Sequence, residues 1–351
     1  MMVQLGFWTD ARWVFLTTQT WMPHQATSAL LYTKPTWGNW DKIPQHQLLN
    51  NVPIDPDSVI VCHNPPCQEL LPWTCHKKTK ASIKMASLNM RGHWNGSVDK
   101  WNHVNQLVRT EWSGLLALQE THLIPVTEMS LNNLFHQRLY IISSIDPQHT
   151  NSGGVATVLN KNITNIWDIG KDVLIPGHAM LVSIPWHHNT EIHVLVIYAP
   201  NAVNENQTFW SDIQSKLRDL APPDIMLGDF NFVEDALDRL PLRSDNEAIT
   251  NSFALLKSSL DLHDGWGQAN PDDITFTYSQ TLAKGRSSSQ IDRIYLWRAL
   301  LPFSNEWDIS VPGILTDHQL ISGKISDSHM PVIGKGRWTL SLFILKDKDL
   351  S

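Results

Sequence analysis

The sequence predicts an α/β protein in which two mixed β-sheets pack face to face between outer helices, a four-layer α/β/β/α sandwich. Three observations lead to this prediction. Short apolar runs alternate with amphipathic helical patterns from Ile83 onward. Several of these runs follow one another with no helix between them, as strands of packed sheets do. Hydrophobic residues make up 42% of the 351 positions and charged residues 17%, which is typical of a globular chain with a packed core.

The predicted elements are arranged in order along the chain. Residues 83–89 form a strand, and residues 97–110 an amphipathic helix with Ser97 as its N-cap. Further helices are expected over residues 205–220, which end before a Pro-Pro pair, and over residues 247–260. The remaining predicted strands cover residues 114–120, 153–160, 178–184, 191–199, 224–231, 275–279, 290–297 and 318–325.

Residues 1–82 differ in character from the rest of the chain. They are rich in Trp, Pro, Gln, Asn and Thr, show no sustained hydrophobic period and are broken repeatedly by proline. We therefore expect an irregular N-terminal extension rather than a second packed domain. The three cysteines of the chain, Cys62, Cys67 and Cys75, lie within this extension beside two histidines. Their spacing matches no common zinc template, so free thiols are favoured over a zinc cluster.

Charge and cysteine usage limit the setting in which the protein acts. An odd, clustered set of cysteines is no disulfide framework and favours a reducing, intracellular compartment. No apolar run reaches membrane-spanning length, so no membrane association is expected. The formal net charge is −7, whereas nucleic-acid binders are more often basic. This counts against DNA as substrate without excluding it, because bound cations offset the charge of a carboxylate metal site.

Polar side chains stand at the ends of the predicted strands, where a sandwich gathers its active-site groups at one edge. Glu120 is a carboxylate that suits a hard cation such as Mg²⁺ or Mn²⁺. Asp229 can orient and deprotonate an attacking water. The imidazole of His318 follows a carboxylate that favours its charged form, which suits contact with phosphate. The full set is Asn89, Glu120, Tyr198, Asn201, Asp229, Asn231, Asp292, Asp317 and His318.

Each of these residues alone is weak evidence, but their order along the chain is specific. The segments SLNMRG, LQETHL, SGGVATVL, IYAPN, GDFN, SQIDRIYL and TDHQLI resemble, in order, the motifs of the endonuclease/exonuclease/phosphatase superfamily. The resemblance covers residues 83–325. Within the superfamily, which includes DNase-I-like and AP-endonuclease-like enzymes, the chain is most similar to the endonuclease domain of LINE-type (non-LTR) retrotransposons, in particular fungal ones.

The resemblance implies a role for each matching position. It implies a Mg²⁺- or Mn²⁺-dependent endonuclease that nicks one strand of DNA, leaves a 3′-hydroxyl and works inside the cell, in the nucleus. The implied metal ligands are Asn89, Glu120 and Asp317, and the implied catalytic residues are Tyr198, Asp229, Asn231, Asp292 and His318. The implied contacts to phosphate or DNA are Asn201, Ser289, Lys284 and Arg286, with Ser289 also supporting Asp292.

The sequence departs from the family pattern at Arg91, where some relatives carry an acidic residue that offers a second metal ligand. Residues 326–351 resemble a connector that leads towards a reverse transcriptase in fungal elements, so a truncated or solitary fragment is expected.

Two alternative functions stay open. One is a phosphatase or sphingomyelinase-like phosphodiesterase of the same fold, favoured by the acidic charge. The other is an inactive relic that acts only as a binding module.

Overall fold

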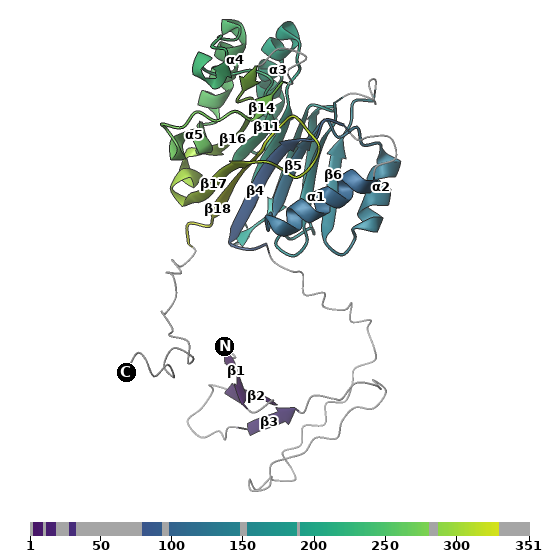
Figure 1. Ribbon diagram of the computed structural model, residues 1–351. Coiled ribbons are helices and arrows are strands. Elements are labelled where there is room, and N and C mark those ends of the chain that lie inside the picture. Colours follow the sequence, from purple (N-terminus) through teal and green to yellow (C-terminus); the bar gives the residue numbers. More distant parts are fainter. Residues whose placement is uncertain are drawn as a thin grey trace, which may run out of the picture. The chain divides into compact units, whose positions relative to one another are not determined.

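The computed structural model divides the chain into two units, Met1–Trp73 and Thr74–Ser351 (Figure 1). In the first unit the structure describes the backbone of three strands. In the second it describes residues 79–92, 98–147, 153–187, 190–280 and 287–329. The predicted N-cap Ser97, the three cysteines and the connector beyond residue 329 lie outside these residues.

The first unit holds a three-stranded antiparallel sheet in the order β1-β2-β3. Its strands are β1 (Val3–Thr9), β2 (Arg12–Thr18) and β3 (Ser28–Tyr32). The sequence predicts irregular backbone here, and for these three segments that prediction is wrong. β1 and β2 are dense in aromatic and β-branched residues, which favour strands even without strict alternation, and β3 contains the apolar run ALLY.

One six-stranded sheet of the second unit has the order β17-β18-β4-β5-β7-β6. Its two central strands, β4 and β5, are parallel, and the other neighbours are antiparallel. The strands are β4 (Ser82–Asn89), β5 (Leu115–Gln119), β6 (Leu139–Ser144), β7 (Val155–Asn160), β17 (Ser304–Ser310) and β18 (Leu320–Ser326).

The other six-stranded sheet has the order β13-β16-β11-β10-β9-β8, again with one parallel pair, β10 and β11. Its strands are β8 (Gly170–Ile175), β9 (Ala179–Pro185), β10 (Glu191–Tyr198), β11 (Ile225–Asp229), β13 (Leu262–Asp264) and β16 (Asp292–Trp297). A small third sheet, β12-β15-β14, consists of two-residue strands at Arg239–Leu240, Ser288–Ser289 and Tyr278–Ser279. The strand expected over residues 275–279 therefore forms only at its end.

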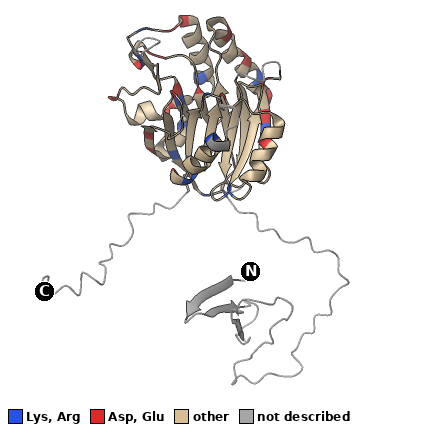
Figure 2. Cartoon of the chain, turned by 45° about the vertical axis from the view of Figure 1, so that its right-hand side comes forward, with Lys and Arg blue, Asp and Glu red and all other residues tan. Residues whose placement is uncertain are grey.

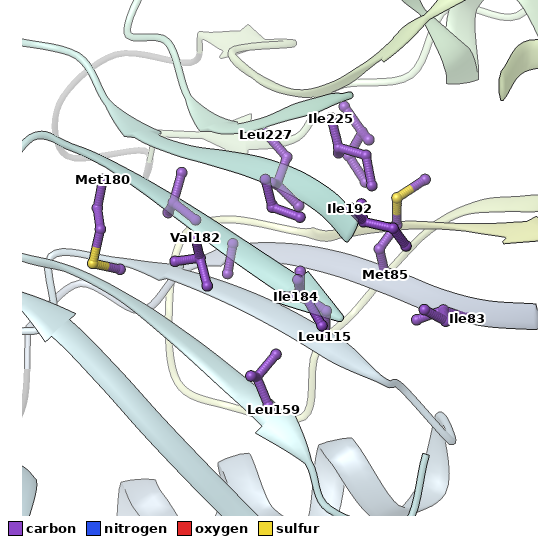
Figure 3. Packing of buried hydrophobic residues seen from close by; sticks show 14 of the residues in the cluster. Ile83, Met85, Leu115, Leu159, Met180, Val182, Ile184, Ile192, Ile225 and Leu227 are labelled. Atoms are coloured by element: carbon purple, nitrogen blue, oxygen red, sulfur yellow. The ribbon is translucent and has the colours of Figure 1, made fainter. Parts of the chain in front are cut away.

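The two large sheets pack face to face through apolar side chains (Figure 3). Met85 and Leu115 from one sheet meet Val182 and Leu227 from the other, and all four are buried. At about 25 cal/mol for each Å² of apolar surface removed from water, such a layer is the main stabilising term of the unit. The predicted face-to-face packing is confirmed.

Helices cover the outer face of each sheet (Figure 1). Apolar residues of α1 (Val98–Thr110) and α2 (Pro125–Leu134) pack on the sheet that contains β4. Those of α3 (Val203–Lys216) and α4 (Glu247–Ser259) pack on the sheet that contains β11. The layers are therefore α/β/β/α, as the sequence predicts. Short helical elements complete the unit at Leu217–Asp219, Ala236–Asp238, Gly265–Ala269 and Arg298–Phe303. In the part of the chain that the structure describes, no helix has both the length and the apolar character to cross a membrane.

Candidate active site

The candidate site lies where the parallel pairs of the two sheets end. In one sheet Asn89 is the last residue of β4 and pairs with Gln119, which directly precedes Glu120. In the other sheet Tyr198 ends β10 and pairs with Asp229, the last residue of β11. Because the sheets are packed face to face, these four polar ends meet at one edge of the sandwich.

The side chain of Asn89 joins the two sheets. Its Nδ2 donates to Oε1 of Glu120 at 3.0 Å and to Oδ2 of Asp229 at 2.9 Å. The hydroxyl of Tyr198 also donates to Oε1 of Glu120, at 3.0 Å. The ring of Tyr198 is held from the other side by His178, whose ring stacks on it with centroids 5.5 Å apart. Two carboxylates from different sheets therefore converge around one amide.

Local backbone conformation aims these groups into the site. Glu120 and Asn231 have φ angles of 51° and 54°, a left-handed conformation that non-glycine residues rarely adopt. Such strain collects at functional sites. In the strand that leads to Asn231, Gly228 has φ 150°, and a Cβ there would lie 1.9 Å from the carbonyl oxygen of Ile197. The GDFN segment therefore needs its glycine so that β10 and β11 can approach each other.

A second buried pair stands beside Asp229. Asp292 lies directly opposite Asp229 in the antiparallel ladder of β11 and β16, and its Oδ2 lies 2.8 Å from Nδ1 of His318. The backbone N–H of Asp292 donates to the hydroxyl of Thr277. The hydroxyl of Thr316 donates to the carbonyl oxygen of Asn89 at 2.8 Å. This bond ties the segment that contains Asp317 and His318 to the end of β4.

Burial and neighbouring charge shift the ionisation of these groups. Burial of Asp229, together with the charge of Asp292, raises its pKa to about 7. Burial alone would lower the pKa of His318, but the charge of Asp292 and the hydrogen bond to it raise that pKa to about 9. Burial, followed by the charge of Glu120, raises the pKa of Tyr198, so its hydroxyl keeps its proton and donates. At neutral pH the site thus combines a poised carboxylate, a cationic imidazole and a neutral phenol.

The donor set fits a hard divalent cation. Asp229, Asp292 and His318 bring ligand atoms within 4.8 Å of one another. Oδ1 of Asp292 is buried without a hydrogen-bond partner among the described residues. An imidazole must be neutral to bind a metal, and the raised pKa of His318 opposes that. The carboxylate oxygens of the site, which include those of Glu120, and the amide oxygen of Asn89 are therefore better ligands than the imidazole, and oxygen ligands suit Mg²⁺ or Mn²⁺.

Glu120, Asp229 and His318 line an open cleft of about 620 Å³. Asn89 and Asp292 are fully buried behind this lining, where Asn89 donates to Asp229 and Asp292 holds His318. The lining is mostly polar and includes the predicted Asn201, Asn231, Ser289 and Asp317. The hydroxyl of Ser289 accepts from Nε of Arg239 at 3.2 Å. The carbonyl oxygen of Ser289 accepts from the backbone N–H of Thr277, whose hydroxyl in turn accepts from the backbone N–H of Asp292. Asn231 donates through Nδ2 to the carbonyl oxygen of Ala199 at 2.7 Å.

Most of the residues predicted for the site come together in this cleft. Lys284 and Arg286 lie outside the residues that the structure describes. Sequence reasoning missed Asn206 on α3, whose buried Nδ2 donates to the carbonyl oxygens of Pro200 and Phe230 and so ties together the segments after β10 and β11. An asparagine four positions before Trp210 on the apolar face of a helix was the available signal. Thr277 carries no such signal, because its contacts to Asp292 form only in the fold.

Comparison with known proteins agrees with this architecture. The endonuclease domain of TRAS1, a telomere-specific non-LTR retrotransposon, superposes with a TM-score of 0.52 at 14% identity, covering 69% of this chain and 98% of that domain. AP endonuclease LMAP from Leishmania major superposes with a TM-score of 0.58 at 13% identity, covering 70% of this chain and 88% of that enzyme. A 3′ phosphatase, NExo from Neisseria, solved with a product DNA hairpin, superposes with a TM-score of 0.54 at 14% identity. The superposition covers 70% of this chain and 99% of that one. At these identities the likeness shows the fold.

Sequence comparison gives a relative and a family. A transposon TX1 protein of 149 kDa from Xenopus laevis, described as uncharacterized, is 26% identical over 236 residues. The match covers 66% of this chain but only 17% of that much longer protein. The model of the Endonuclease/Exonuclease/phosphatase family matches residues 86–327, which contain every group of the cleft floor. On this match, together with the fold, the chain belongs to the Endonuclease/Exonuclease/phosphatase family.

Proposed function

We propose that the domain over residues 83–325 is a Mg²⁺- or Mn²⁺-dependent DNA endonuclease that nicks one strand by water attack and leaves a 3′-hydroxyl. The observation that carries this proposal is the convergence of Asn89, Glu120, Asp229 and the Asp292–His318 pair at one cleft, which Glu120, Asp229 and His318 line. The retrotransposon endonuclease of the same fold and the TX1 relative support DNA as the substrate.

Glu120 and Asn89 would hold the cation, because Nδ2 of Asn89 donates to Oε1 of Glu120 and so keeps the two side chains together, and each side chain also has an oxygen that can serve as a ligand. A bound divalent cation supplies Lewis-acid polarisation of a phosphoryl oxygen and neutralises charge that develops there. Asp317 is expected from the sequence to be a further ligand, but its Oδ2 pairs with Arg91 at 2.7 Å. We therefore assign the ligand role to Glu120 and Asn89 first.

The protein groups supply the proton transfers and the positioning. Asp229 would orient a water and accept its proton, because a pKa raised to about 7 makes it a better base than an ordinary carboxylate at neutral pH. The cationic His318, oriented by Asp292, would donate to a phosphoryl oxygen. Tyr198 would donate its hydroxyl proton in a hydrogen bond to phosphate or to the leaving oxygen, and Asn231 would hold the water in line.

The proposed substrate implies a cellular setting. With DNA as its partner the enzyme would act in the nucleus, and the 3′-hydroxyl that it leaves would be a primer end for a reverse transcriptase. The distribution of charge does not argue for long-range attraction of DNA. In the view of Figure 2, Lys and Arg are interspersed with Asp and Glu among the described residues of the second unit. Local contacts in the cleft must therefore provide most of the affinity for phosphate.

The test is nicking of supercoiled plasmid by the purified chain. We expect relaxation to the open circle with Mg²⁺ or Mn²⁺, none with EDTA, and loss of at least about 100-fold in rate for Asp229→Ala. Extension of the nick by a DNA polymerase without phosphatase treatment would identify the 3′-hydroxyl. If wild type and Asp229→Ala nick the plasmid at the same background rate, the proposal is wrong.

A second candidate is a phosphatase of the same fold. The net charge of −7 and the likeness to a DNA 3′ phosphatase favour it. Release of inorganic phosphate from a 3′-phosphorylated oligonucleotide or from small phosphoesters, without plasmid nicking, would select this activity. Absence of metal-dependent turnover on all these substrates would leave the inactive binding module.

A further inference from the structure

Arg91 stands in the turn that leaves β4 and reaches across the edge of the cleft. Its Nη1 lies 2.7 Å from Oδ2 of Asp317, and both residues line the cleft together with Glu120 and His318. The side chain of Arg91 remains 55% exposed and that of Asp317 only 18%. An ion pair this open to water contributes little to stability, so folding alone does not account for it.

The turn that carries Arg91 is held rigidly. The backbone N–H of Arg91 donates to Oδ1 of Asn89 at 2.9 Å, and that of Gly92 donates to the carbonyl oxygen of Glu120 at 2.7 Å. The buried ammonium of Lys100 donates to the carbonyl oxygens of Met90 and Gly92 on either side of Arg91. The arginine itself has φ 51°, a conformation that costs free energy for a side chain of its size. These bonds fix its backbone beside two proposed metal ligands.

The guanidinium keeps donors that Asp317 does not use. An arginine carries five N–H donors in a planar fork, and among the described residues the contact to Asp317 involves Nη1 alone. The remaining donors stand at the edge of a cleft whose floor is built to handle a phosphodiester. A planar fork matches two oxygens of one phosphate, which a single ammonium group does not.

The pair also changes what Asp317 can do. A carboxylate that holds a guanidinium at 2.7 Å has already had its charge compensated, and a divalent cation on the same carboxylate would lie beside the positive guanidinium. Two cations so close repel each other, so Arg91 and a metal compete for this edge of the cleft.

We propose that Arg91, oriented by Asp317, binds a phosphate of the substrate and is the fixed positive charge at this edge, so that the site takes up one divalent cation, on Asn89 and Glu120, and no second one on Asp317. This inference rests on the proposed endonuclease function and extends it to a residue that departs from the family pattern. Asp317 is then a positioning residue for the guanidinium rather than a metal ligand.

Metal stoichiometry gives the first test, because it needs no turnover. Titration calorimetry with Mn²⁺ should give one site in wild type and one in Asp317→Asn. Arg91→Asp places a second carboxylate opposite Asp317 and should create a second site. Two Mn²⁺ sites in wild type, reduced to one by Asp317→Asn, would overturn the inference, as would a single site that Asp317→Asn abolishes.

Binding of a fluorescent DNA oligonucleotide in Ca²⁺, which serves as a non-activating cation, gives the second test. Arg91→Met should weaken binding about 10-fold and lower the slope of log affinity against log salt by about one ion. Arg91→Lys should recover the salt slope but only part of the affinity, because it keeps the charge without the fork. Arg243→Met is the matched control. This exposed arginine lines the same cleft, so its loss should also lower the salt slope of DNA binding. Unlike a change at Arg91, however, Arg243→Met should not alter the number of Mn²⁺ sites, either in the wild-type background or when combined with Arg91→Asp.

The outcomes separate this inference from the proposed function. If wild type nicks plasmid but Arg91→Met binds DNA as tightly as wild type, the inference fails and the endonuclease stands. If wild type does not nick but Arg91→Met loses affinity, Arg91 is a phosphate ligand in a protein with another activity. No measurable DNA binding by wild type would overturn the role given to Arg91.

Discussion

Asp292 and His318 form a buried ion pair in which Oδ2 of the carboxylate lies 2.8 Å from Nδ1 of the imidazole. Asp292 begins β16 in one sheet, and His318 stands two residues before β18 in the other. The pair therefore links the two sheets directly beneath the cleft, which His318 lines. The raised pKa of His318 requires Asp292 beside it, so the charge of the imidazole depends on the two sheets keeping their relative positions.

Replacement of Asp292 should remove the cationic state of His318 at neutral pH. In Asp292→Asn the largest of the charges that raise the pKa of His318 to about 9 is gone, and the burial that lowers this pKa remains, opposed by the weaker influence of Asp229 and Asp317. We expect nicking at about pH 7.5 to fall about 100-fold or more. The resonance of His318, identified by its absence in His318→Gln, should titrate well below pH 9 in an NMR pH series.

A matched pair on the surface provides the control. His263 lies 3.0 Å from the partly exposed Asp261, outside the cleft. Asp261→Asn should leave nicking unchanged. A His318 resonance in Asp292→Asn that still titrates near pH 9 would show that another group sets its charge.

The pKa of Asp229 makes a prediction about stability without metal. Burial raises this pKa from 3.8 to about 7 in the folded protein, so the folded state holds the proton more tightly than the unfolded chain. The resulting stabilisation is complete below about pH 4 and is lost as the pH rises through about 7. The amide that Asp229→Asn introduces does not titrate. The Tm of this variant relative to wild type, measured in EDTA, should therefore rise by roughly 5 °C between about pH 5 and about pH 7.5, on the order of 2 kcal/mol.

Asp212→Asn is the control for this pH series. Asp212 is exposed on α3, and its replacement should shift the Tm by the same small amount at every pH. A difference between Asp229→Asn and wild type that is constant over the whole pH series would contradict the raised pKa of Asp229.

The sequence predicts the inner strands of the two large sheets better than it predicts their edge strands. The sequence predicts all eight inner strands of the two sheets, including β4, β5, β10 and β11, which carry the site. It does not predict the four edge strands β6, β8, β13 and β17. An inner strand is covered on both faces and becomes a continuous apolar run. β8 and β17 have mostly exposed or half-buried residues, so they lack the apolar pattern that marks a strand.

The candidate site shows the same division between local and distant information. Asn89, Glu120 and Asp229 end apolar strands, so their places at one edge follow from the strand pattern and from the family motifs. The salt bridge of Arg91 with Asp317 joins residues 226 positions apart and departs from the family pattern. No local period encodes such a contact, because it forms only once β4 and β18, which are far apart in the chain, pair as neighbours in one sheet. The contact of Thr277 with Asp292 is hidden for the same reason.

The hydroxyl of Tyr198 should matter for turnover more than for folding. Tyr198→Phe keeps the ring that stacks on His178 and removes only the hydroxyl, which donates to Glu120 and is also hydrogen-bonded to Asn201. We expect the Tm to change by a few degrees at most, since one hydrogen bond contributes about 1 kcal/mol net. The kcat for nicking should fall about 10- to 100-fold at unchanged DNA affinity, because the donor acts on charge that develops in the transition state. A variant with wild-type kcat would exclude this hydroxyl from the reaction.

Asn206 should hold the segments after β10 and β11 in place without touching the substrate. Its buried amide donates to the carbonyl oxygens of Pro200 and Phe230 at 2.9 and 3.1 Å, and its Oδ1 accepts from the indole N–H of Trp210. Asn206→Ala leaves these three buried polar groups without a partner. At about 1 kcal/mol or more for each group, the Tm should fall by roughly 6–12 °C.

The same change should lower nicking because Asn201 and Asn231 stand in the two segments that Asn206 joins. The loss should be largest near the Tm of the variant and should shrink on cooling, whereas the loss in Asp229→Ala should not depend on temperature in this way. Asn204→Ala is the matched control, since Asn204 is an exposed asparagine on the same helix, two residues before Asn206. Thermal melts and nicking rates for Asn206→Ala that match those of Asn204→Ala would show that the segments hold their positions without this amide.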